Sequence, residues 1–118
     1  MNFYFDNERP IYVQIVEQLK LYILIGKFSL GERLPSVRDL ALLCKVNPNT
    51  MQSALNILED ELLIYTERTN GKFVTNDQKL IKKLKENLAK TTVDIYLKDM
   101  EKIGFTKEEA IKYLKECK

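Results

Sequence analysis

Apolar residues recur every three or four positions near the start of the chain, which is the spacing of an amphipathic helix. The positions are Ile11, Ile15, Leu19 and Ile23. Pro10 suits the first turn of such a helix, and Gly26 suits its end. The apolar pattern extends over residues 11–28 and predicts a helix that ends at Gly26, followed by a connector over residues 29–35.

Two shorter helical patterns follow the connector. Ser36 is a good N-cap, and apolar residues then repeat at helical spacing as far as Cys44. Asn47 is a second N-cap, with Pro48 at the first helical position, and this helix continues to about Asp60. Two helices separated by a few residues are typical of a helix-turn-helix.

The pattern changes again after residue 63. Residues 64–68 and 72–75 have the composition of two short strands around an Asn70-Gly71 turn. A hairpin directly after a helix-turn-helix is the wing of a winged helix. We therefore expect a mainly α fold with a small β-hairpin, and a winged helix-turn-helix domain over residues 9–76.

The remaining residues, 77–118, predict two more helices. The first is long and ends at Gly104, and a capping box of Thr106 and Glu109 opens the second. Since so long a helix needs a partner surface, we expect residues 77–118 to form a helical dimerisation tail, although its apolar stripe is also compatible with folding back on the N-terminal core. The residues expected at the dimer contact are Leu80, Ile81, Leu84, Leu88, Ile95, Met100 and Ile103.

Composition narrows the function classes. Histidine is absent, which removes the commonest general base and metal ligand, and Cys44 and Cys117 lie far apart in sequence. No paired nucleophile and base, metal-ligand spacing or phosphate-binding glycine loop is visible, so we expect no enzyme, cofactor or metal. No apolar run approaches the roughly 20 residues of a membrane span and no signal peptide is visible, so we expect a cytoplasmic protein.

Charge alone does not point to nucleic acid. The formal net charge is +2, and residues 1–75 hold eight Lys or Arg against nine Asp or Glu. Any contact with nucleic acid must therefore come from particular positions rather than from bulk charge.

Several stretches occur in the order and spacing of one known family. They are PIYVQI at 10–15, Gly26, LGERLPSVRDLA at 30–41, VNPNTM at 46–51, Ala54-Leu55, Leu58-Glu59 and GKFV at 71–74. On these residues the chain resembles the GntR family of bacterial regulators, and its short tail resembles the YtrA-type subfamily, in which two C-terminal helices serve dimerisation. The resemblance implies a homodimeric regulator, often of transporter operons, with a frequently unassigned effector.

The second helix of a helix-turn-helix enters the major groove of DNA by its N-terminal end. The polar residues at that end suit base edges or phosphate oxygens, and they are Asn47, Asn49, Thr50, Gln52 and Ser53. For Asn47, capping and phosphate binding are equally good interpretations. Ser36 and Arg38 open the preceding helix, and the resemblance implies that Arg38 contacts the operator.

The hairpin offers a second contact surface for DNA. The residues that flank its tip, and that would bring positive charge and backbone amides to a minor groove, are Arg68, Gly71 and Lys72. The hairpin departs from the family pattern at Glu67, where a basic residue is common, and at Thr69, where glycine is usual. Leu62 likewise replaces the usual glycine before the first strand.

These features favour a sequence-specific DNA-binding transcriptional regulator, expected to be a repressor, that binds a palindromic operator as a homodimer. A small-molecule effector is a further expected partner. The alternative is a winged-helix module that binds protein without operator DNA, for which the acidic balance of residues 1–75 is the main argument.

Overall fold

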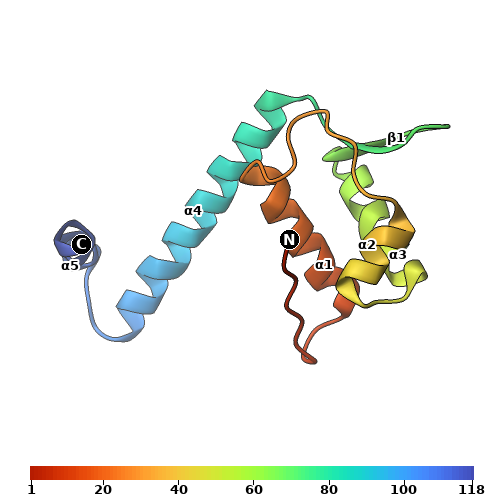
Figure 1. Cartoon of the computed structure of the whole chain (residues 1–118). Helices are drawn as coiled ribbons and strands as arrows, with labels where there is room; N and C mark the ends of the chain where they lie inside the picture. Colours follow the sequence, from red (N-terminus) through yellow and green to blue (C-terminus); the bar gives the residue numbers. More distant parts are fainter. The chain divides into compact units, whose positions relative to one another are not determined.

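The computed structural model describes residues 1–118 and divides into two compact units, Met1–Ile81 and Lys82–Lys118. Seven elements follow one another along the chain (Figure 1). They are α1 (Ile11–Leu24), α2 (Val37–Cys44), α3 (Pro48–Asp60), β1 (Ile64–Glu67), β2 (Gly71–Val74), α4 (Gln78–Lys102) and α5 (Lys107–Glu116). The predicted mainly α fold with one β-hairpin is confirmed. None of the helices combines the length and apolar character that crossing a membrane requires.

The core of the first unit lies between α1, α2, α3 and the inner face of the hairpin. Its fully buried side chains are Ile15, Leu19, Leu40, Met51, Leu55, Leu58, Leu63, Ile64 and Val74. Cys44 is a buried free thiol in this core, and burial raises its pKa to about 11. The apolar positions that predicted the helices and strands are therefore the positions that fill the core.

The first helix ends before its apolar pattern does. α1 stops at Leu24, because Gly26 has a φ of 81° and its N–H donates to the carbonyl of Ile23. Phe28 is nevertheless buried. The predicted helix end at Gly26 is therefore confirmed, and Phe28 packs into the core from a turn and not from the helix.

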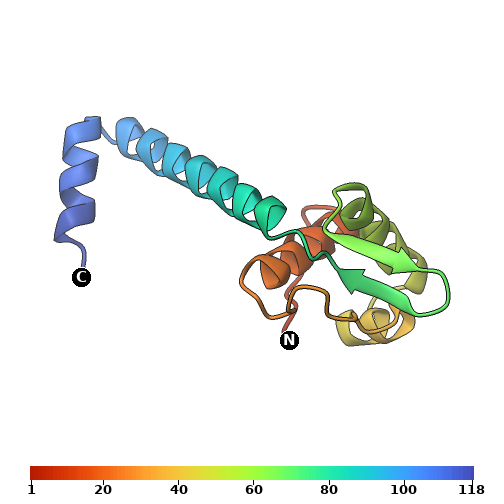
Figure 2. The ribbon, with the colours of Figure 1, turned by 90° about the horizontal axis from the view of Figure 1, so that it is seen from above.

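The two strands of the hairpin lie side by side (Figure 2), and a segment outside the hairpin extends their sheet. The connector before α2 pairs with the free edge of β2: the N–H of Val74 donates to the carbonyl of Glu32 at 2.9 Å, and the N–H of Leu34 donates to the carbonyl of Lys72 at 2.8 Å. The sequence predicts only an irregular connector here, because this stretch lacks the apolar alternation of a strand. The pairing anchors residues 32–34 on the wing.

Two helices of the first unit end on a residue with a side chain in the left-handed conformation. Lys45 follows α2 with a φ of 57°, and Leu62 follows α3 with a φ of 65°. At the second end, the N–H of Leu62 donates to the carbonyl of Glu59 and the N–H of Leu63 to that of Leu58, both at 3.0 Å, which is the Schellman pattern. The left-handed conformation costs a residue with a Cβ about 1–2 kcal/mol. Leu62 is thus strained.

The first residues of the chain form an extended arm along α1 (Figure 1). Three side chains of α1, spaced four residues apart, bind three arm residues, spaced two residues apart. Each side chain accepts a hydrogen bond from the backbone N–H of its arm residue and donates one to the carbonyl of the same residue. The helix residues are Gln14, Gln18 and Tyr22, and their partners are Asp6, Tyr4 and Asn2. Four helical residues rise about 6 Å and two extended residues span about 6.6 Å, so the two repeats match.

The second unit contains α5 and most of α4. The predicted capping box is confirmed: the N–H of Glu109 donates to Thr106 Oγ1 at 3.2 Å, and the N–H of Thr106 donates to Glu109 Oε1 at 3.0 Å. The hydroxyl of Tyr96 donates to the carbonyl of Ala110 at 2.7 Å and joins the two helices. Ala110 is the only buried residue of this unit.

We predict that Leu62→Gly stabilises the first unit. Glycine relieves the left-handed strain but adds freedom to the unfolded chain, so the expected net gain is about 0.5–1 kcal/mol. Urea unfolding followed by circular dichroism measures it. Leu62→Ala removes the same exposed side chain and keeps a Cβ, so it should show no comparable gain; equal gains from both variants would contradict the strain.

We predict that Gln14→Ala destabilises the first unit by about 1–3 kcal/mol, because Gln14 is buried and its three part-buried hydrogen bonds to Asp6 and Arg9 are lost. Gln18→Ala is the matched control, since its hydrogen bonds to Tyr4 are exposed to water. Urea midpoints and protease cleavage of the arm measure both variants. Equal, small effects would mean that the arm is not held by the buried glutamine.

Candidate nucleic-acid interface

The N-terminal end of α3 presents a polar surface because the opposite side of the helix is buried. Met51, Ala54, Leu55 and Leu58 have no exposed surface, so the residues between them face solvent. Asn47 Oδ1 accepts from the N–H of Asn49 at 2.7 Å and caps the helix. The capping interpretation of Asn47 is confirmed for its carbonyl oxygen, and its amide group makes no other hydrogen bond.

The predicted contact residues on α3 differ in whether their side chains already form hydrogen bonds within the protein. The side chain of Asn49 is exposed and makes no hydrogen bond. Gln52 Nε2 donates to Asn56 Oδ1 at 2.7 Å, and Ser53 Oγ donates to the carbonyl of Asn49 at 3.1 Å. Thr50 is half-buried. Asn49 is therefore the residue of this group that is most available to another molecule.

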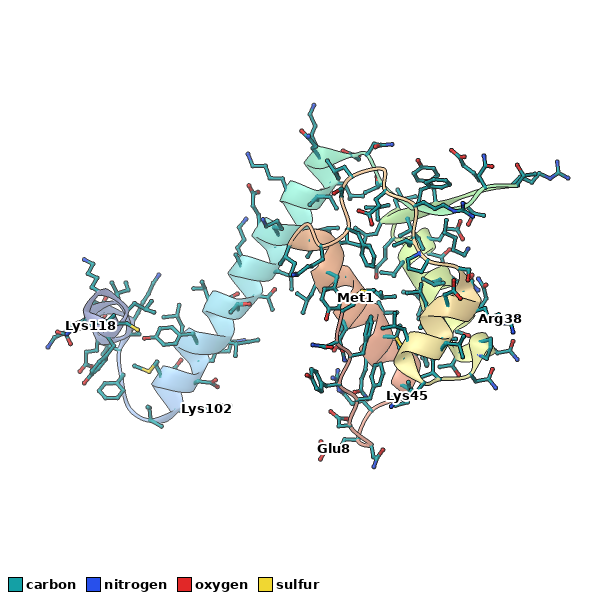
Figure 3. All side chains as sticks on the ribbon, in the orientation of Figure 1. Met1, Glu8, Arg38, Lys45, Lys102 and Lys118 are labelled. Atoms are coloured by element: carbon teal, nitrogen blue, oxygen red, sulfur yellow. The ribbon has the colours of Figure 1, made fainter.

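Arg38 lies in the first turn of α2 and has no ion-pair partner. Ser36 caps the same helix, since its Oγ accepts from the N–H of Asp39 at 3.1 Å. Arg38 is exposed, and Figure 3 shows it on the side of the first unit toward which the hairpin projects. A guanidinium without an acidic partner, on this side, is free to bind an anion such as a phosphate.

The strand pleat decides which wing residues face outward. Ile64 and Val74 point into the core, so Thr66 and Lys72, which oppose each other two residues along, point to the same inner side. Lys72 Nζ donates to Thr66 Oγ1 at 2.9 Å and lies 3.8 Å from a carboxylate oxygen of Glu59. The side chain of Lys72 is only 15% exposed. Its predicted DNA contact stays a prediction, but its ammonium already has two protein partners.

The outer side of the wing carries aromatic rings and the space left by a glycine. Tyr65 opposes Phe73, and their rings stack with centroids 5.6 Å apart. Gly71 has a φ of 101°, and a Cβ there would lie 3.3 Å from Nε of Arg33. No pattern in the sequence singles out Arg33, because only the pairing of the connector with β2 brings this arginine to the wing.

The hairpin tip has mixed charge. Arg68 is exposed and unpaired, whereas the neighbouring Glu67 accepts from Asn70 Nδ2 at 3.2 Å. The carboxylate is therefore held at the turn, where it opposes the attraction of the arginine for an anion.

The residues predicted for dimerisation fall into two groups on α4. Leu84, Leu88 and Ile95 are four and seven residues apart and share a helix face, with Leu80 and Ile81 preceding them. Met100 lies on a different face of α4, and Ile103 lies in the turn directly after the helix. The exposed fractions of Leu88, Ile95 and Ile103 are 40%, 55% and 69%. These side chains are apolar groups without cover in the chain.

Known proteins share both the sequence and the organisation of this chain. A model of the bacterial regulatory proteins of the gntR family matches residues 11–74. The HTH-type transcriptional regulator YhcF of Bacillus subtilis is 37% identical over 112 residues, which cover 94% of this chain and 92% of YhcF. The HTH-type transcriptional repressor YtrA of Bacillus subtilis is 36% identical over 98 residues, with 78% and 75% covered.

Solved structures show the same fold. A GntR family transcriptional regulator from Listeria monocytogenes superposes with a TM-score of 0.89 at 38% identity, covering 97% of this chain and all of that one. The DNA-binding domain of AraR in complex with operator ORE1 has a TM-score of 0.55 at 25% identity, and it covers 64% of this chain and 94% of that one. The chain therefore belongs to the gntR family of bacterial regulatory proteins, and it is a DNA-binding transcriptional regulator with a winged helix-turn-helix.

Proposed function

We propose that this regulator is a repressor that binds a palindromic operator as a homodimer in the cytoplasm. Residues 9–76 form the DNA-binding domain and residues 77–118 the dimerisation tail. The observation that carries the proposal is the pair formed by Asn49, with an unbonded amide, and Arg38, with an unpaired guanidinium, at the starts of the two helices. An amide suits an adenine edge and a guanidinium suits a guanine edge or a phosphate.

The other predicted contacts support this central pair. Asn47, Thr50, Gln52 and Ser53 surround Asn49 at the helix end, where free backbone N–H groups favour phosphates. Ser36 lies at the start of α2, where free backbone N–H groups likewise favour a phosphate. Arg68 and the backbone of Gly71 form the wing contact, and Lys72 steadies the wing through Glu59 and Thr66.

A dimer follows from the balance of charge. Since residues 1–75 have no excess of positive charge, one domain offers few attractive contacts to DNA, and two copies on one palindrome double them. A helix of 25 residues without a single buried residue is also poorly stabilised on its own. Burial of its apolar side chains against a second copy supplies the missing stabilisation.

The relatives supply the direction of regulation. YtrA is a transcriptional repressor, and the AraR domain is bound to an operator. We extend both properties to this chain. A small-molecule effector that modulates operator binding is part of the same proposal.

A protein-binding winged helix remains the second candidate, because the first unit is slightly acidic. The two functions differ in their response to salt. Operator binding releases counterions from DNA, so its association constant falls steeply as salt rises, whereas protein docking need not change in this way.

We predict that Arg38→Ala and Asn49→Ala each weaken operator binding by about 1–3 kcal/mol, because each removes a base or phosphate contact. Selection from a random DNA pool first supplies the operator, and fluorescence anisotropy then measures the dissociation constants. Arg9→Ala is the control, since Arg9 is paired with Glu17 at 2.7 Å. Unchanged binding by both test variants would exclude this contact surface.

We predict that a chain ending at Thr75 is a monomer with weak operator binding, whereas the full chain is a dimer in sedimentation velocity. In the full chain, Ile95→Glu should weaken the dimer, because it buries a charge in the contact. Lys90→Gln changes the net charge equally on another face of α4 and should leave the dimer intact. A dimeric truncated chain would refute the role of the tail.

A further inference from the structure

The position of Arg33 is fixed by the backbone rather than by its own side chain. Arg33 forms an isolated antiparallel bridge with Phe73, between the two hydrogen bonds that tie the connector to β2. Cross-strand partners point to the same side of a sheet, so Arg33 shares the outer side of the wing with Phe73 and Tyr65. The backbone of Arg33 is therefore held at the sheet edge as firmly as that of a strand residue.

The guanidinium of Arg33 occupies the space that Gly71 leaves open. Gly71 lies two residues before Phe73 on β2 and is therefore the diagonal cross-strand neighbour of Arg33 on that side. A Cβ at Gly71 would lie 3.3 Å from Nε and 3.5 Å from Nη2 of Arg33. Any larger side chain at position 71 would therefore push the guanidinium away. Gly71 therefore has two roles: it adopts a positive φ, and it leaves space for the guanidinium of Arg33.

This guanidinium is an unpaired cation on the outer side of the wing. Arg33 is exposed and has no ion-pair partner within 4.0 Å. The nearest acid on the same side of the sheet by register is Glu67, opposite Gly71, and its carboxylate is hydrogen-bonded to Asn70. Of the other cations of the hairpin, Lys72 is bound on the inner side and Arg68 lies exposed at the tip.

We propose that Arg33 binds a DNA phosphate and is the cation through which the outer side of the wing contacts the duplex. The proposal rests on the operator-binding function and adds to it a residue outside the helix-turn-helix. Arg33 precedes Arg38 by five residues, so the two arginines lie at either end of the short segment that leads from the wing into α2. A phosphate contact positions the protein without reading sequence. Removal of this contact must therefore weaken binding to all DNA alike.

The test compares four arginine and lysine variants at several salt concentrations, with the selected operator and with an unrelated duplex as probes. Arg33→Gln should weaken binding to both duplexes roughly 5- to 10-fold near 0.1 M salt. It should also make the negative slope of log K against log salt shallower, by about 0.9 for each phosphate that is no longer neutralised. Arg33→Lys keeps the charge and should keep most of the slope. Lys20→Gln and Arg9→Gln remove the same charge from residues that are ion-paired outside the wing, with Glu61 and Glu17, and should leave the slope unchanged.

Thermal unfolding by circular dichroism accompanies each binding curve, so that a folding defect is not mistaken for the removal of a phosphate contact. The inference is overturned if Arg33→Gln, correctly folded, retains the wild-type slope, or if Lys20→Gln or Arg9→Gln changes it equally. The proposed function fails separately, when the unaltered chain itself shows no salt-dependent binding to either duplex, and the inference then fails with it.

Discussion

Burial of one side of α3 is the constraint on which the rest of the first unit depends. Met51, Leu55 and Leu58 are fully enclosed, and removing any of them would open a cavity costing several kcal/mol. Because these side chains lock the rotation of the helix about its axis, the polar residues at its N-terminal end have only one direction to face. The direction of the proposed DNA-reading surface therefore follows from core packing.

The same logic extends to the wing through the strand pleat. Ile64 and Val74 must be buried against α3, and the two-residue repeat then commits Thr66 and Lys72 to the inner side. The resulting group of Glu59, Thr66 and Lys72 links α3 to the hairpin through hydrogen bonds and an ion pair. A cation that looks free in the sequence thus attaches the wing to the helix, and the outer side of the wing depends on other residues.

The arm along α1 is a different kind of solution. Its backbone groups have no sheet to join, and glutamine and tyrosine side chains on the helix take the place of a neighbouring strand. The match between four helical residues and two extended ones makes this arrangement repeatable. It stabilises the helix that underlies α3, and so supports the reading surface from behind.

Local chemistry in the sequence was enough to predict the helices, the hairpin and most boundaries, because caps, prolines and apolar spacing act over a few residues. Ser36, Asn47 and the Thr106–Glu109 box are examples, each confirmed by its hydrogen bonds. The ordered family stretches likewise pointed to Arg38 and Asn49, since both stand beside a recognisable cap.

Tertiary structure alone decided the pairing of residues 32–34 with β2, the position of Lys72 on the inner side of the wing and that of Arg33 on the outer side. These features depend on which side chain fits a space formed by residues far away in the chain. The charge of Lys72 and Arg33 is visible in the sequence, but its direction follows from strand register and from the missing side chain of Gly71, which are properties of the packed fold.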